Sequence, residues 1–180
     1  MVPEAKLEST EHGLVPTSDG WFVLNAREAR WYHAEGRGAV TVFEGETAFP
    51  QLGINLRVLE PGEPLGMYHW EADQEDFLIL AGEALLMVEG EERALRQWDF
   101  VHCPPETNHI IVGAGSGRCV LLAVGSREHA ETDRWGGYTV DEVAARHGAS
   151  VATETTKPEE AYAHVPRREP TEYREGWLQP

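Results

Sequence analysis

The feature that most constrains the fold is the lack of any long helical period between Trp21 and Ser126. Short apolar or alternating runs follow one another along this stretch, and glycine and proline separate them. This pattern is typical of an all-β sandwich or barrel. Glu89-Gly90 is predicted to be the turn of a hairpin over residues 85–95. The nine predicted strands cover residues 21–24, 38–43, 54–59, 77–81, 84–88, 93–95, 99–103, 108–112 and 119–124.

Toward the C-terminus the pattern changes. Residues 139–148 combine a capping-type start, an alanine-rich middle and a terminal glycine, which predicts one short helix. A second short helix is predicted around Pro158, because proline is tolerated in a first helical turn. The segment from His164 onward is rich in proline and charge but contains Tyr173 and Trp177. It is predicted to be either an extended arm docked by these aromatic side chains or a disordered tail.

The length of 180 residues suits one domain of ordinary size with some additions. We expect an N-terminal arm with an edge strand at 1–37, a β-barrel at 38–126 and a helical and extended C-terminal arm at 127–180. Cys103 and Cys119 are too few for a disulfide framework and are interpreted as buried apolar residues.

The net charge of the chain limits the kinds of binding partner that it suits. The chain has 31 Asp and Glu against 15 Lys and Arg, a formal net charge of -16, which disfavours nucleic acid and acidic membrane surfaces. No apolar run approaches the ~18 residues of a membrane helix. The polar N-terminus has no apolar stretch typical of a secretion signal, so we expect a cytoplasmic protein.

Two histidines and two glutamates are candidate metal ligands. If His69 and Glu71 lie on an extended segment, the two-residue period places both side chains on one face. Glu75 could return to that face after a short acidic turn, and His109 leads a later strand after the break at Pro104-Pro105. Imidazole and carboxylate groups that converge inside a barrel suit a divalent transition metal such as Mn, Fe, Co, Ni or Zn.

Other residues near these ligands have assignable roles. Met67 and Phe77 would share the faces of His69 and Glu75 and are predicted to line an apolar pocket or to pack in the core. His102 is a candidate acid/base group, although strand alternation alone does not fix the face on which it lies.

Residues 62–109 resemble the cupin superfamily of small barrels, which includes RmlC-like proteins, in two motifs. The first family motif is Gly, a short spacer, His-x-His, three or four residues, Glu, six residues and Gly. The second is Gly, five residues, Pro-x-Gly, two residues and His. The corresponding positions here are Gly62, His69-Trp70-Glu71, Glu75 and Gly82, and then Trp98, Pro104-Pro105-Glu106 and His109. The spacings of the second motif are kept, but Trp98 and Glu106 replace its two glycines.

The resemblance implies a double-stranded β-helix, a jelly-roll-like barrel, followed here by short C-terminal helices and an extended tail. It implies that His69, Glu75 and His109 hold one divalent metal (Mn, Fe, Ni or Zn), with Glu71 in place of the usual second histidine. It also implies a homodimer and a small-molecule substrate or ligand.

Two functions from different classes stay open at this point. One is a metal-dependent enzyme acting on a small organic molecule as an oxygenase or other oxidoreductase, a decarboxylase or an isomerase. The alternative is a non-catalytic barrel that binds a small ligand or a metal.

Overall fold

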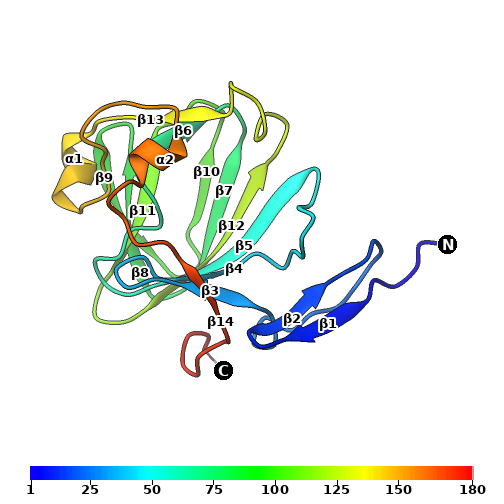
Figure 1. Ribbon diagram of the computed structural model, residues 1–180. Coiled ribbons are helices and arrows are strands. Elements are labelled where there is room, and N and C mark those ends of the chain that lie inside the picture. The colour runs from blue at the N-terminus through cyan, green and yellow to red at the C-terminus, as the bar shows by residue number, and fades with distance from the viewer. Residues whose placement is uncertain (180) are drawn as a thin grey trace.

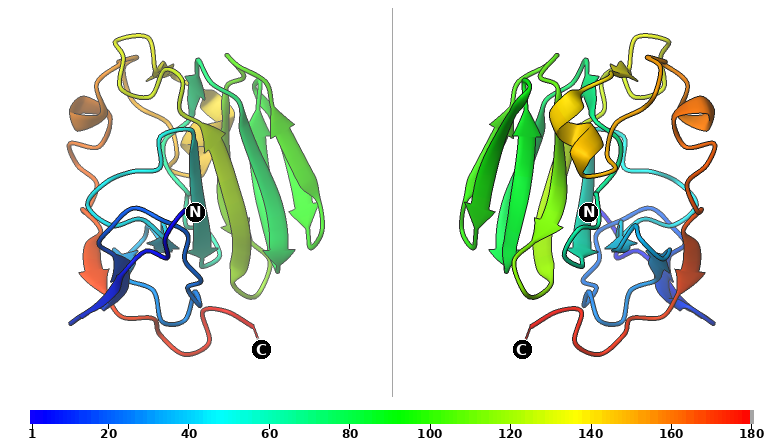
Figure 2. Two further views of the ribbon diagram at one scale, coloured as in Figure 1. Left: turned by 90° about the vertical axis from the view of Figure 1, so that its right-hand side faces the viewer. Right: turned by 90° about the vertical axis from the view of Figure 1, so that its left-hand side faces the viewer.

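Two antiparallel β-sheets face each other in the computed structural model, which describes residues 1–179 (Figures 1 and 2). The larger sheet has the strand order β10-β7-β12-β5-β4-β3-β14, and the smaller has the order β13-β6-β11-β8-β9. The strands are β3 (Trp31–His33), β4 (Ala39–Thr41), β5 (Leu52–Leu59), β6 (His69–Glu71), β7 (Glu75–Ala81), β8 (Glu83–Val88), β9 (Glu91–Arg96), β10 (Phe100–Cys103), β11 (His109–Ala114), β12 (Cys119–Ser126), β13 (Gly136–Tyr138) and β14 (Glu169–Thr171).

Most of the predicted strands are present, and the all-β prediction is confirmed. The hairpin of β8 and β9 turns at Glu89 and Gly90. Both residues have positive φ, which a two-residue type I′ turn requires. The strand predicted at residues 21–24 was wrong. Trp21 forms a single bridge to Glu4, and its side chain is exposed, so this segment has no buried face to stabilise it as a strand.

The sequence pattern missed a separate hairpin and several short strands. The hairpin of β1 (Leu7–Thr10) and β2 (Gly13–Pro16) lies to one side of the barrel (Figure 1). Strands β3, β6, β13 and β14 have three residues each, too few for a periodic pattern. Strands β3, β13 and β14 come from outside residues 38–126 but extend the two sheets of the barrel, so the domain boundaries at 37 and 126 stay a proposal. The predicted C-terminal arm includes Pro180, which lies outside the described residues.

The main core lies between the two sheets. Alternate residues of facing strands fill it, among them Leu59, Ile79 and Leu121, which are fully buried. Cys103 and Cys119 are free thiols within this core, which confirms their interpretation as buried apolar residues. Burial raises the pKa of Cys119 to about 12, so this thiol stays protonated at neutral pH.

Two helices lie outside the barrel. Helix α1 (Glu142–Arg146) begins at Asp141, whose side chain accepts a hydrogen bond from the Ala144 amide, and it packs on the outer face of the smaller sheet. Helix α2 (Pro158–Ala161) has proline in its first turn, as predicted. Across residues 1–179, no helix has the length and apolar character needed to span a bilayer.

The C-terminal arm is docked against the barrel, so the disordered alternative does not hold for its described residues. Trp177 is 6% exposed, and its ring centroid lies 5.1 Å from that of the fully buried Trp31. Tyr173 contacts both rings. Strand β14 pairs with β3, which fixes the arm to the end of the larger sheet.

Both positions where the resembled family has glycine keep the backbone conformation that glycine favours. Trp98 has a φ of 75° and Glu106 a φ of 69°, in the left-handed region that is costly for residues with a Cβ atom. The chain has therefore kept the turns of the second motif without the residues best suited to them.

Glu106→Gly is expected to raise the free energy of unfolding by about 0.5–1 kcal/mol, because the relief of strain exceeds the added entropy of the unfolded chain. Its side chain is exposed, so no packing is lost. Denaturant titration measures the change, and Glu106→Ala, which keeps the Cβ atom, is the matched control. Equal stability of the two variants would contradict the strain argument.

Candidate metal centre

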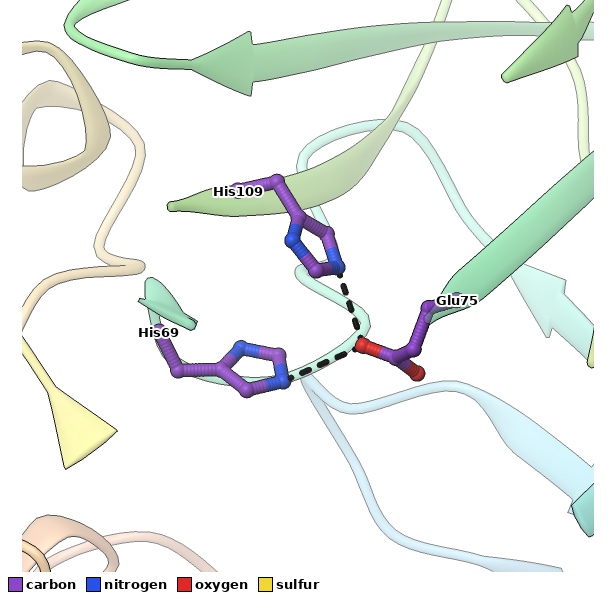
Figure 3. A group of neighbouring side chains, drawn as sticks. All are labelled: His69, Glu75 and His109. Carbon is purple, nitrogen blue, oxygen red and sulfur yellow. Dashed lines mark ion pairs between the residues drawn. The ribbon is translucent and has the colours of Figure 1, made fainter. Parts of the chain in front are cut away.

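His69, Glu75 and His109 converge at one end of the barrel interior (Figure 3). The His109 Nε2 atom lies 3.1 Å from Glu75 Oε2, and the His69 Nε2 atom lies 3.6 Å from the same oxygen. The two imidazole centroids are 5.0 Å apart. The side chains of His69, Glu75 and His109 are 13%, 17% and 3% exposed, so the cluster is shielded but still reaches solvent.

Strand pairing explains this convergence. His69 on β6 and His109 on β11 are direct partners in the smaller sheet, which places their side chains next to each other on one face. Glu75 begins β7 in the opposite sheet, after a short turn that crosses between the sheets. Asp73 in that turn is buried and accepts two hydrogen bonds from His129, from its amide and from its Nδ1, each 2.8 Å long.

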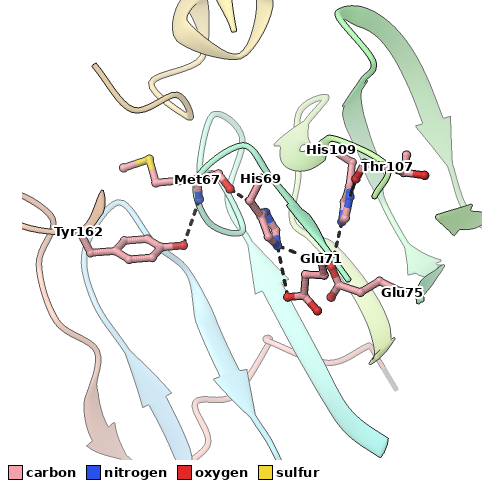
Figure 4. A network of polar contacts seen from close by, with 7 residues as sticks. All are labelled: Met67, His69, Glu71, Glu75, Thr107, His109 and Tyr162. Atoms are coloured by element: carbon pink, nitrogen blue, oxygen red, sulfur yellow. Dashed lines mark hydrogen bonds and ion pairs between the residues drawn. The ribbon is translucent and has the colours of Figure 1, made fainter. Parts of the chain in front are cut away.

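Backbone carbonyls orient both imidazoles. The Nδ1 atom of His69 lies 2.8 Å from the Met67 carbonyl oxygen, and that of His109 lies 2.9 Å from the Thr107 carbonyl oxygen (Figure 4). A carbonyl oxygen only accepts, so each Nδ1 carries the donated proton. In the neutral rings Nε2 is then an acceptor whose lone pair points toward Glu75, the arrangement common in metal-binding histidines.

Two buried atoms at the centre of the cluster have no hydrogen-bond partner. These are Glu75 Oε2 and His109 Nε2, which face each other. With the neutral imidazole both atoms are acceptors, and burying two unpaired acceptors together costs free energy unless a positive charge lies between them. The donor set therefore fits a cation.

The pKa values show the same preference. Burial acts to lower the pKa of His69, whereas the Glu71 and Glu75 carboxylates raise it above the ordinary value. Burial likewise opposes the charged form of His109, but Cys103 and Glu75 raise its pKa to about 10. Burial acts to raise the pKa of Glu75, yet His109 and His69 hold it well below its usual range. The cluster thus stabilises positive charge beside an ionised carboxylate.

Glu71 lies at the edge of this cluster. Its Oε1 is 3.5 Å from His69 Nε2, and its side chain is 28% exposed. It shares the face of β6 with His69, as the two-residue period predicts, but the group of three convergent ligand atoms does not include it.

His102 and the two predicted lining residues lie differently. His102 is on the outer face of β10, half-exposed, and bonds Asp76 through Nδ1 at 2.7 Å, so it does not face the cluster and the acid/base role predicted for it has no geometric support. Phe77 is buried, with its ring centroid 5.4 Å from that of His109. The Met67 side chain points away from Glu75, and its carbonyl is the part that serves the site (Figure 4).

Sequence reasoning missed the residues that surround the mouth of the barrel. The Tyr138 ring lies 5.9 Å from the His69 ring, and Tyr162 receives a hydrogen bond from the Met67 amide at 3.1 Å. Arg57 projects into the barrel from β5. For Arg57 a signal existed: a cation between the apolar residues Leu56 and Val58 of a predicted strand. The two tyrosines come from distant segments and had no local signal.

Comparison with known proteins finds a family model that matches the central part of the chain. Residues 55–125 match the cupin domain model. No curated protein matches this chain. A solved structure from Acidithiobacillus ferrooxidans, assigned as a sugar phosphate isomerase, is 30% identical over 43% of this chain and 51% of that chain, with a TM-score of 0.42. This chain thus spans about half of the length of that protein.

Two other solved structures cover more of the chain. The polyketide cyclase RemF from Streptomyces resistomycificus is 12% identical over 59% of this chain and 79% of its own, with a TM-score of 0.50. A cupin 2 conserved barrel domain protein from Salinispora arenicola is 18% identical over 62% of this chain and 92% of its own, with a TM-score of 0.49. At this level of identity the likeness to RemF shows the fold alone.

Proposed function

Because residues 55–125 of this chain form a cupin domain, we propose that the protein is an iron-dependent oxygenase that acts on a small organic molecule at His69, Glu75 and His109. The observation that carries the proposal is the convergence of two imidazoles and one carboxylate on a pair of buried, unpaired acceptor atoms. Among oxygenases, decarboxylases and isomerases, this set of metal ligands is most typical of an oxygenase.

The donor set is the reason for iron. Mixed nitrogen and oxygen ligands suit Mn, Fe, Ni and Zn, but two histidines with one carboxylate and further positions left open are typical of non-haem Fe(II) oxygenases. Bound iron would supply the activation of dioxygen, which no protein side chain provides. Because Glu71 lies outside the group of three convergent ligands, more coordination positions of the metal stay open for substrate and dioxygen than four protein ligands would leave.

The chain's own residues hold and shape the site. The Met67 and Thr107 carbonyls keep the two imidazoles in the tautomer that presents Nε2 to the metal. Phe77 supplies an apolar wall beside His109. Glu71, partly exposed and 3.5 Å from His69 Nε2, is placed to exchange a proton between the substrate and solvent.

Elemental analysis of protein purified without a metal-affinity column tests this proposal. The expected result is about one equivalent of iron per chain, followed by oxygen uptake with a substrate found by screening small organic acids and aromatic compounds. Stoichiometric zinc or nickel, without oxygen uptake after reconstitution with Fe(II), would contradict the oxygenase. Failure to bind any metal would favour a non-catalytic binding protein.

Glu71→Gln is expected to retain metal, with an affinity within about tenfold of the wild type, because Glu71 lies outside the convergent group. Glu75→Gln has the same shape and charge change and is expected to lose most of the metal. Competition with a chelator measures both affinities. Equal losses in the two variants would instead make Glu71 a fourth ligand.

We further propose that the protein is a cytoplasmic homodimer. Strand β10 is a terminal strand of the larger sheet, and Trp98 and Phe100 at this edge are 68% and 64% exposed. A second copy that covers these rings and the edge would remove both from water. Light scattering is expected to give twice the chain mass, and Phe100→Glu is expected to give a monomer. A monomeric wild-type protein would refute the dimer.

A further inference from the structure

One arginine points into the barrel from the middle of a core strand. Arg57 on β5 is the direct partner of Leu121 on β12, and Leu121 is fully buried between the two sheets. Its neighbour Val58 belongs to the outer face, where it packs with Trp31. Arg57 therefore lies on the inner face, where a charged side chain is rare unless it is paired.

The Arg57 side chain is directed along β5 toward the end of the strand that lies across from Glu75. Its Nε donates a 2.7 Å hydrogen bond to Asn55 Oδ1, two residues closer to the end of β5 that lies across from Glu75. The row of Asn55 continues through Ala123 to Phe77, whose ring contacts His109. In the next row glycine occupies positions 53 and 125, with the Arg127 guanidinium against Gly53 and the Glu75 side chain against Gly125.

Arg57 has no carboxylate partner within residues 1–179: no ion pair involves it, and its one side-chain hydrogen bond is to the neutral Asn55. Burial lowers its pKa to about 10, an effect that Tyr162 and Glu75 oppose, so it stays charged at neutral pH. Arg57 is partly buried. A partly desolvated cation without a counter-ion is costly, and an anion that binds beside it recovers part of that cost.

Two further arginines make this side of the mouth positive. The Arg37 guanidinium lies 4.6 Å from the centre of the Tyr162 ring, and Arg168 donates to the Arg37 and Leu65 carbonyl oxygens. Burial first, and then the nearby charges of Arg57 and Arg37, lower the pKa of Arg168 to about 9. Neither Arg37 nor Arg168 forms an ion pair in the part of the chain that the structure describes.

We propose that Arg57, with Asn55 beside it, binds a carboxylate group of the substrate, so that the substrate is a small organic acid. This inference rests on the proposed function for the idea that the ligand is a substrate. The charges support it: a divalent metal balances Glu71 and Glu75, whereas Arg57, Arg37 and Arg168 form no ion pair in the described residues, which leaves surplus positive charge for an anionic group. The two Nη groups of a single guanidinium match the two oxygens of a carboxylate.

Titration of metal-loaded protein with propionate, its neutral analogue propionamide and inorganic phosphate tests the inference by calorimetry. Propionate is expected to bind, and Arg57→Met to weaken it at least about tenfold, since charge-assisted hydrogen bonds are lost. Arg57→Lys keeps the positive charge but not the planar guanidinium with its two Nη groups, so its affinity for propionate is expected to lie between those of the wild type and Arg57→Met. The matched control is Arg93→Met, because Arg93 is an exposed residue of β9.

Equal propionate affinity in the wild type and Arg57→Met would overturn the inference, as would propionamide binding as tightly as propionate. Phosphate binding that depends on Arg57, without propionate binding, would overturn the carboxylate assignment. The same titrations on metal-free protein separate this inference from the proposed function. Propionate binding that depends on Arg57 in a protein that takes up no metal would support the anion site and refute the oxygenase.

Discussion

The His109→Ala variant is expected to purify without the metal that the wild-type protein retains. His109 Nε2 is a buried, unpaired atom that faces Glu75, and its loss leaves one imidazole and one carboxylate. Since even loss of a group that only orients a ligand lowers metal affinity 10–100-fold, loss of the ligand itself is expected to exceed about 100-fold. Elemental analysis and chelator competition measure the difference.

His102→Ala is the matched control, because His102 lies on the outer face of β10 and is expected to leave the metal content unchanged. Truncation of a buried ring can also destabilise the fold, so Glu75→Gln, which keeps the shape of the side chain, gives an independent measurement. Full metal occupancy in His109→Ala would remove the metal centre from this cluster and with it the proposed oxygenase.

The cluster could be predicted from sequence because spacing carries it. An extended segment fixes the common face of His69 and Glu71, and the motif spacings place Glu75 and His109 at two further strand ends. What spacing does not contain is strand register. Register puts His69 opposite His109, turns His102 outward and leaves Glu71 at the edge.

The fold divides in the same way. Strands of five or more residues with apolar alternation were predictable, since burial between the sheets dictates their pattern. Strands of three residues are held by a neighbouring strand, as β6 is by β11 and β14 is by β3, and their own sequence says little. The unusual charge of Arg57 within a core strand was visible, but its meaning depends on knowing that this face of β5 looks toward Glu75.

Trp177→Ala is expected to lower the free energy of unfolding by about 3 kcal/mol, at the lower end of the cost of removing a large buried aromatic ring. The ring is 6% exposed and packs on Trp31, His33 and Tyr173. Denaturant titration measures the loss. Trp21→Ala is the control, because Trp21 is 53% exposed and lies away from the proposed dimer edge, so its truncation is expected to change stability by less than about 0.5 kcal/mol.

The docking of the arm also bears on the mouth of the barrel. The arm carries Tyr162, which bonds the Met67 amide, and Arg168, which bonds the Arg37 and Leu65 carbonyls. If Trp177 anchors the arm, Trp177→Ala is expected to increase hydrogen exchange at the Met67 amide more than at the core amides of β12. Unchanged stability and unchanged exchange in this variant would mean that Trp177 does not hold the arm. The pairing of β14 with β3 would then account for its position.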